Sequence, residues 1–193
     1  MLAKTGLGLA LLAAAFGIGC ASGGGADPYL RPSGPAGIEV YVAPGAGAVK
    51  TVAVLPFKAE TELIGNSVAD MVMTQLLRSG KYAVMERSRL NQVLGETELA
   101  VAGLADSKLA DLGAMAGADA IVTGTVEEYG TVAVRGKALP NVALSVRLVD
   151  GASGKILWSV EGTARAGSGG ATVSQQARDL VRRMMVELYQ RLP

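Results

Sequence analysis

The residue types that most often carry out chemistry in proteins are scarce in this chain. It has no histidine and a single cysteine, Cys20. Without histidine it cannot build a Ser-His-Asp or Cys-His catalytic site, or a zinc site with imidazole ligands. Carboxylates, lysines, tyrosines and serines remain, with no spacing that indicates a catalytic site. We therefore predict no enzymatic activity, no catalytic residues, no cofactor and no metal, which leaves Cys20 as the residue to explain.

Residues 1–19 have the layout of a secretory signal. One charge, Lys4, precedes an uncharged apolar segment that runs from Leu7 to Gly19. This segment of about 13 residues is shorter than the ~20 that a membrane-spanning helix needs. A short positive start followed by a short apolar run is typical of a cleaved signal peptide.

Cys20 ends this segment, and Ile18-Gly19-Cys20 resembles the signal of bacterial lipoproteins. In such signals the cysteine is lipidated and becomes the mature N-terminus, although Gly17 stands where an aliphatic residue is usual. Cleavage after Ala13-Ala14-Ala15 is the alternative and would leave a thiol with no second cysteine to pair with. We expect lipidation at Cys20, where each buried methylene of the acyl chains contributes about 0.8 kcal/mol to anchoring. Ala21 follows it rather than aspartate, which in signals of this kind implies the outer membrane.

Residues 20–37 are predicted to be a flexible tether. The stretch from Ala21 to Gly37 contains three prolines and five glycines and cannot bury a core. Residues 38–193 are long enough for one domain with its own core. The chain carries 18 basic and 17 acidic residues, and removing residues 1–19 removes only Lys4, so the mature chain is close to neutral. We therefore expect no nucleic-acid partner.

The first half of the folded part alternates strands and helices. The apolar run Thr51–Phe57 predicts a buried strand, and Ile38–Val42 an edge strand before it. Helical spacing of apolar residues predicts a helix from about Gly65 to Ser79, closed by Gly80. A further strand at Tyr82–Glu86 would lie parallel to the first. Two more helices are expected to begin at Ser88 and Asp106.

The second half predicts an antiparallel meander over residues 118–162 and a final helix. Its strands are expected at Ala118–Glu128, at Val142–Leu148 and around Trp158, with a turn over residues 150–154. The final helix, about Thr172 to Leu192, carries an apolar stripe made of Val173, Ala177, Leu180, Val181, Met184 and Leu188. The predicted fold is therefore α/β: a single domain with a mixed parallel and antiparallel sheet covered by helices.

Several other features have a functional interpretation and a structural one. Glu127-Glu128 would point to opposite faces of a strand and are interpreted as solvated charge at its end. The glycines of residues 167–170 lack the GK[ST] ending of a phosphate-binding loop, and those of residues 113–117 follow no strand. The final helix carries four arginines mostly off its apolar stripe. They could contact a membrane or an acidic partner, but we expect them to form the solvated face of a packed helix. Those arginines are Arg178, Arg182, Arg183 and Arg191.

The order of segments resembles the CsgG family of bacterial outer-membrane lipoproteins, whose relatives include LpoB activators and TolB N-terminal-like domains. The resemblance covers roughly residues 50–163 and the lipidated start. It rests on VAVLPF, IGNSVADMV, GKYAVMERSRLNQVLGE, LADLGAMAGADAIVTGTV and VRLVDGASGKILWS. Its most specific parts are Glu86-Arg87 with Leu90, and Gly117-Ala118-Asp119-Ala120 leading to Gly124.

This resemblance implies a periplasm-facing outer-membrane lipoprotein that helps to assemble or export a cell-surface structure through protein contacts. Self-association of the chain is compatible with this role. The curli secretion channel of the family adds membrane-crossing hairpins at two places, where this chain has only residues 131–140 and 164–171. Two spanning strands need about 9–11 residues each, so we expect no pore. An LpoB-like activator of a peptidoglycan synthase is the alternative. The short tether, roughly 55–60 Å when extended, counts against it.

Overall fold

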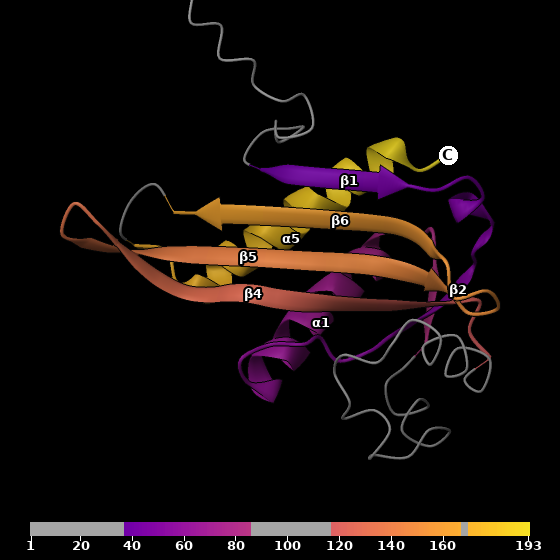
Figure 1. Ribbon diagram of the computed structural model, residues 1–193, viewed down its shortest axis with the longest axis horizontal. Coiled ribbons are helices and arrows are strands. Elements are labelled where there is room, and N and C mark those ends of the chain that lie inside the picture. The colour runs from indigo at the N-terminus through magenta and orange to yellow at the C-terminus, as the bar shows by residue number, and fades with distance from the viewer. Residues whose placement is uncertain (1–36, 86–116, 167–169) are drawn as a thin grey trace, which may run out of the picture. The chain divides into compact units, whose positions relative to one another are not determined.

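The computed structural model describes residues 37–85, 117–166 and 170–193, which form a six-stranded mixed sheet and two long helices (Figure 1). The strand order is β1-β6-β5-β4-β2-β3. This confirms the predicted single-domain α/β fold. The elements are β1 (Ile38–Val42), β2 (Thr51–Val54), α1 (Glu62–Ser79), β3 (Ala83–Met85), β4 (Ala120–Val134), β5 (Lys137–Asp150), β6 (Ile156–Arg165) and α5 (Val173–Arg191), with a short 3-10 turn at Ala46–Ala48.

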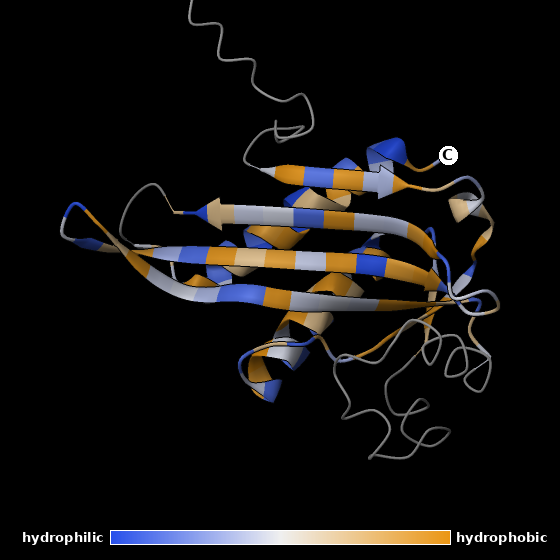
Figure 2. Cartoon of the chain, in the orientation of Figure 1, coloured by the Kyte–Doolittle hydropathy of each residue, from blue (hydrophilic) through white to orange (hydrophobic). Residues whose placement is uncertain are grey.

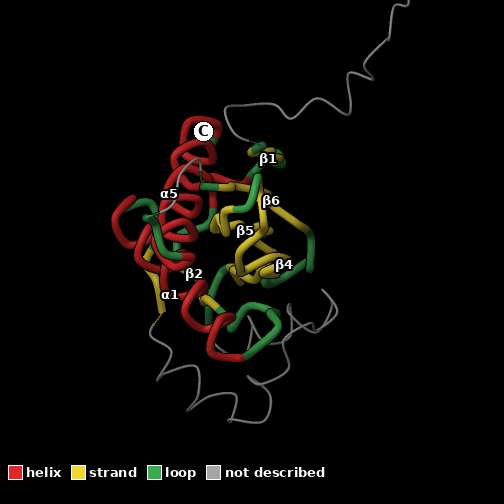
Figure 3. The backbone as a smooth tube through the Cα atoms, turned by 90° about the vertical axis from the view of Figure 1, so that its left-hand side faces the viewer, coloured by secondary structure: helices red, strands yellow, loops and turns green. Residues whose placement is uncertain are grey.

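Both helices cover the same face of the sheet, as the end-on view shows (Figure 3). The core lies between these two layers and includes Trp158, Phe57 and Leu144. Along the strands, apolar residues alternate with polar ones (Figure 2), so one face is buried under the helices and the other, here called the open face, is more polar. Inside the core, Trp158 Nε1 donates a hydrogen bond to the hydroxyl oxygen of Tyr82 at 3.2 Å.

The parallel part of the sheet is β2 between β3 and β4, as predicted for the first strand–helix–strand unit. However, β2 ends at Val54, earlier than the expected Phe57. Pro56 has no N–H and cannot continue a ladder of hydrogen bonds. The chain still follows β4, because the Leu55 N–H donates to the Val122 carbonyl at 3.0 Å and Lys58 forms a bridge to Thr125.

Helix α1 begins three residues before the predicted Gly65. Thr61 is its N-cap, and the Thr61 hydroxyl accepts a hydrogen bond from the Ile64 N–H at 3.3 Å. Gly80 closes the helix with φ +63°, which confirms the predicted end. The final helix is also confirmed: α5 is capped by Thr172, whose side chain and that of Gln175 form a capping box. The two helices predicted to begin at Ser88 and Asp106 lie outside the described residues.

The meander is confirmed, but its strands are longer than predicted. β4 and β5 continue to a two-residue turn at Arg135-Gly136, where both φ angles are positive, 49° and 76°. Such angles suit the right-handed twist of paired strands. Residues 131–140 are therefore the tip of a hairpin and not a loop. β6 pairs with β5 only as far as Asn141, so the tip extends beyond β6 (Figure 1).

A β-bulge interrupts β4 between Val126 and Glu128. Before it, alternate residues such as Val122 and Val126 face the helices. The extra residue, Glu127, reverses this alternation. Tyr129 therefore packs against the core, whereas Glu128, which strict alternation would bury, is exposed on the open face.

We predict that Gly124→Ala destabilises the protein by about 1–3 kcal/mol, the usual cost of overpacking a core. A Cβ at this position would lie 2.5 Å from the Ser145 carbonyl oxygen and 2.7 Å from the ring of Phe57. Gly130→Ala in the same strand is the matched control, because a Cβ there meets nothing within 4 Å. Urea unfolding of both variants measures the difference. Equal midpoints would show that the Phe57 contact does not constrain position 124.

Candidate interaction surface

The predicted lipidation site, Cys20, lies outside the described residues, so its role stays a prediction. The prediction that Glu127 and Glu128 are solvated is confirmed, since both are exposed. Their placement at a strand end was wrong, because β4 continues to Val134 and both lie at the bulge. Glu127 is the extra, exposed residue, and Glu128 accepts a hydrogen bond from the Nδ2 of Asn141.

Asn141 is the centre of a small polar network that sequence reasoning missed. Its side chain is only 5% exposed, so it must find partners. Its Nδ2 donates to Glu128, and its Oδ1 accepts from Arg165 Nε at 3.4 Å. The three side chains tie β4, β5 and β6 together on the open face, at the base of the hairpin tip. The available signal was Glu128, a carboxylate at a position that unbroken alternation would assign to the core.

Asp119 explains the structural role of the Gly117–Ala120 motif. Its carboxylate accepts hydrogen bonds from the backbone N–H groups of Thr51 at 2.8 Å and Lys50 at 3.0 Å. These two donors, Thr51 first, lower the pKa of Asp119 below its ordinary value. Asp119 thus fastens the start of β2 beside the start of β4. The motif therefore helps to hold the two strands together.

A polar groove of about 490 Å³ runs between α1 and α5, with Tyr129 of β4 at its base. Most of its lining side chains carry hydrogen-bonding groups. They are Ser67, Asp70, Met71, Thr74, Gln75, Arg78, Tyr129, Ser174, Arg178, Asp179 and Arg182. The reversal of alternation at the bulge is what brings Tyr129 to this side of the sheet.

The two helices that form the groove are tied together by Tyr189. Its hydroxyl donates to the Gln75 backbone carbonyl of α1 at 3.2 Å. Burial raises the pKa of Tyr189 to about 12, with a smaller, opposing effect from a hydrogen bond to Ser79. The phenol therefore remains a protonated donor throughout the physiological pH range.

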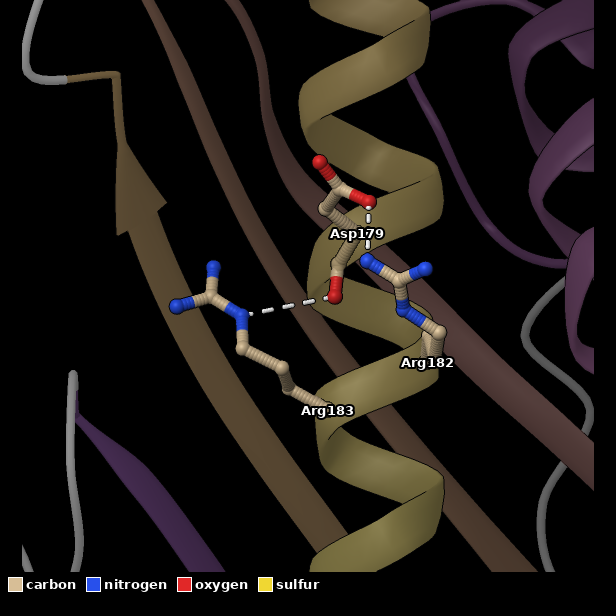
Figure 4. Close-up of polar contacts among 3 residues, drawn as sticks. All are labelled: Asp179, Arg182 and Arg183. Atoms are coloured by element: carbon tan, nitrogen blue, oxygen red, sulfur yellow. Dashed lines mark hydrogen bonds and ion pairs between the residues drawn. The ribbon is translucent and has the colours of Figure 1, made fainter.

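The charges along α5 lie on two sides of the helix (Figure 4). Arg182 pairs with the Asp179 carboxylate at 2.7 Å, and both line the groove. Arg183 points to the other side of the helix and donates from Nε to the Asp179 backbone carbonyl at 3.4 Å. Three arginines and two aspartates line the groove in total, so its charge is net positive. This arrangement favours an acidic partner over a basic one.

The described residues also bear on two other kinds of functional feature, a metal site and a membrane-spanning helix. Among them, no three His, Cys, Asp or Glu side chains gather closely enough to hold a metal ion. Within the same ranges, no helix combines the length and apolarity required to cross a membrane.

The family of this chain follows from a comparison with protein-family models. The model described as "Curli production assembly/transport component CsgG" matches residues 45–177, well over half of the chain. The chain belongs to the CsgG family. The match covers β2 to the first turn of α5, including every strand except β1, and it confirms the resemblance found in the sequence.

Solved structures similar to this CsgG-family chain include a single-site variant of the PelC dodecamer from Paraburkholderia phytofirmans. It is 19% identical, with a TM-score of 0.54 over 77% of this chain and 95% of that one. Lipoprotein GNA1162 from Neisseria meningitidis is 26% identical, with a TM-score of 0.50 over 64% and 87%. The LpoB C-terminal domain from Salmonella enterica is 18% identical, with a TM-score of 0.46 over 60% and 82%. The PelC and GNA1162 matches support the fold.

We predict that Asp119→Asn lowers stability at neutral pH by about 1 kcal/mol, because an amide accepts the two backbone hydrogen bonds less strongly than a carboxylate. The native pKa of Asp119 is depressed, so its contribution is complete above the unfolded value of about 4 and is lost as pH falls through the folded pKa. The difference between native protein and variant should therefore shrink below about pH 4.

Thermal unfolding at a series of pH values measures this difference, with Glu127→Gln as the control. Glu127 is also an exposed carboxylate of β4. A constant difference from pH 7 to pH 3 would contradict the role given to the Asp119 charge.

Proposed function

We propose that this protein is a periplasm-facing outer-membrane lipoprotein that acts as an accessory component in the assembly or export of a cell-surface structure. The observation that carries the proposal is the CsgG-family match across residues 45–177, which includes most of the folded domain. The family description names curli production assembly and transport, and the groove between α1 and α5 supplies a surface for a protein partner.

In this proposal Cys20 is the lipid anchor and residues 20–37 are the tether that lets the domain stand away from the membrane. The apolar segment before Cys20 and the glycines and prolines after it support this arrangement. The tether joins the domain directly at β1, whose first residue is Ile38.

The hairpin of β4 and β5 supports an accessory role over a pore. Past the end of β6, only residues 131–134 and 137–140 continue the two strands. A spanning strand needs about 9–11 residues. One of the two places where the resemblance puts a family hairpin would therefore hold only a short tip that ends in Arg135-Gly136.

The partner we propose is a cell-envelope protein that places an acidic segment in the groove. Arg178 and Arg182 of α5 face Asp70 and Arg78 of α1 across it, and Arg182 is already paired with Asp179. Counted together, three arginines and two aspartates line the groove, so its charge is net positive. Electrostatic complementarity of this kind sets partner choice and association rate.

The groove can be tested by photo-cross-linking in living cells. A photoreactive amino acid at Ser174, in the groove, should capture a partner identified by mass spectrometry, whereas the same group at Ala152, in the exposed turn after β5, should capture it far less. Arg178→Glu should reduce capture at Ser174 at least about fivefold, since reversing a charge at an interface costs on the order of 1 kcal/mol or more. Arg135→Glu at the hairpin tip is the matched charge reversal and should leave it unchanged.

The identity of the captured protein decides between the two functions. A secretion or appendage component, or the protein itself, supports the proposal. A peptidoglycan synthase would instead support the LpoB-like role and contradict the one proposed. Equal capture by the Arg178→Glu variant would contradict the groove as the docking surface.

The anchor is tested separately by Cys20→Ser. We expect the native protein to incorporate a palmitate analogue and to sediment with outer membranes. The variant should carry no label and should be found in the soluble fraction, because the chains that bury their methylenes in the bilayer are missing. Cell fractionation and in-gel detection of the label measure both. A native protein without label would show that cleavage occurs elsewhere.

A further inference from the structure

Strand β1 forms one edge of the sheet, and half of its backbone groups point away from the sheet. Among the described residues its only partner strand is β6. The Ala43 N–H donates to the Leu157 carbonyl at 2.7 Å, and the Thr163 N–H donates to the Gly37 carbonyl at 3.4 Å. Since hydrogen-bonded and non-hydrogen-bonded pairs alternate, Glu39 and Tyr41 also bond β6.

The three residues between them therefore direct their N–H and C=O groups outward. These are Ile38, Val40 and Val42. An exposed strand edge is a template for another strand, and natural proteins usually protect it with lysine, proline or a bulge. Residues 38–42 have no lysine, no proline and no register shift. The edge of β1 is thus suited to strand addition.

The side chains of β1 on the open face indicate which strand fits. Glu39 lies directly opposite Glu161 of β6, and both are exposed. Like charges at directly opposed positions destabilise a sheet. The next residue on this face is Tyr41, which is 55% exposed and is one of the few large hydrophobic side chains left in solvent. A strand added at this edge would be stabilised if it placed a hydrogen-bond donor beside Glu39 and a side chain against the exposed ring of Tyr41.

We propose that β1 pairs in antiparallel fashion with β1 of a second copy of this chain, about a two-fold axis at Val40. In this register Val40 lies opposite the partner's Val40, and Ile38 lies opposite the partner's Val42. All three outward-facing residues of each strand are then paired, which makes six backbone hydrogen bonds. The paired side chains on the helix face are all β-branched and apolar, a favourable cross-strand combination.

The same register also gives Glu39 and Tyr41, on the open face, suitable neighbours from the partner strand. Glu39 lies opposite the partner's Tyr41, whose O–H can donate to the carboxylate and whose ring covers its methylenes. A register shifted by two residues in one direction would oppose Glu39 to the partner's Glu39. A shift in the other direction would oppose Ile38 to the partner's Pro44, which has no N–H. Charge and hydrogen bonding thus select the two-fold register.

The surroundings of β1 leave room for this pairing. α5 packs mainly against β6 and β5 and less against β1, and its last turn passes behind the Val42 end of β1 (Figures 1 and 3). A two-fold axis at Val40 places the last turns of the two copies at opposite ends of the paired strands. The two chains enter their β1 strands at opposite ends of the pair, about 14 Å apart at ~3.4 Å per residue. Tethers of the length proposed above can reach one membrane from both ends. The inference goes beyond the proposed function and does not depend on it.

Cysteine cross-linking in the full-length protein tests the register. Val40→Cys should form a disulfide-linked dimer on mild oxidation, because opposed hydrogen-bonded residues have Cα atoms about 5.5 Å apart, within disulfide range. Val42→Cys is the matched control. The partner's Val42 would lie four residues along the strand, about 14 Å away, beyond that range. The native chain, with Cys20 in place, controls for cross-linking through its own cysteine.

A proline substitution tests the strand pairing itself. Val40→Pro removes an N–H that points outward and is not used by β6, so the fold should survive, as circular dichroism can verify. Two of the six intermolecular hydrogen bonds are lost, and the dimer dissociation constant measured by analytical ultracentrifugation should rise at least about tenfold. Val40→Thr keeps both the N–H and the β-branched shape and should dimerise nearly as well as the native chain.

Three results would overturn the proposal. The first is a native protein that stays monomeric at tens of micromolar, the second is equal cross-linking of the Val40→Cys and Val42→Cys variants, and the third is unchanged dimerisation of Val40→Pro. Coverage of the edge by the tether or by a different strand of a second copy would appear as failure of Val40→Cys to link to itself. The photo-cross-linking at Ser174 is unaffected by any of these outcomes, so the two proposals fail separately.

Discussion

The bulge at Glu127 is the constraint on which much of this structure depends. β4 is shared by the parallel and antiparallel parts of the sheet, and one extra residue in it exchanges the two faces for everything that follows. Upstream, Val122 and Val126 lie under the helices, whereas downstream Tyr129 takes that side. The groove between α1 and α5 has an aromatic base only because of this exchange. The Glu128–Asn141 pair lies on the open face for the same reason.

Close packing around Phe57 connects that strand to the helix layer. The carbonyl of Phe57 would lie 2.1 Å from a Cβ at Gly65 of α1, and its ring lies against Gly124 of β4. Glycine at both positions lets the chain after β2 pass between a helix and a strand that approach it closely. Gly162 of β6 has a similar relation to Met184 of α5. α5 is thus also closely packed against the sheet, and the two helices have little freedom to shift.

The chain has no histidine and one cysteine, and the described residues present several different surfaces. The helix side presents a groove of mixed charge with an excess of arginine. The open side presents hydroxyl groups and charged side chains of both signs, and the β1 edge presents backbone groups. These surfaces suit three kinds of contact: an acidic segment, polar neighbours and another strand.

Local patterns in the sequence determined which elements exist. The period of the apolar residues identified α1, α5 and the strands of the meander, and Gly80 and Thr172 marked helix ends, because propensity and capping act over a few residues. The segments VAVLPF and GADAIVTGTV carried the family resemblance. The early end of β2 could also have been read locally, since Pro56 cannot donate a hydrogen bond.

Only the tertiary structure decided where the polar residues lie. Alternation along β4 is a local rule, but the bulge that breaks it is stabilised by partners on β5, such as Asn141, that are distant in sequence. The groove joins residues of α1, β4 and α5, and β1 becomes an edge of the described sheet because it pairs with β6. The local sequence specifies whether each segment prefers to be a helix or a strand. Which residues of distant segments lie side by side depends on the packing of the whole sheet and helix layer.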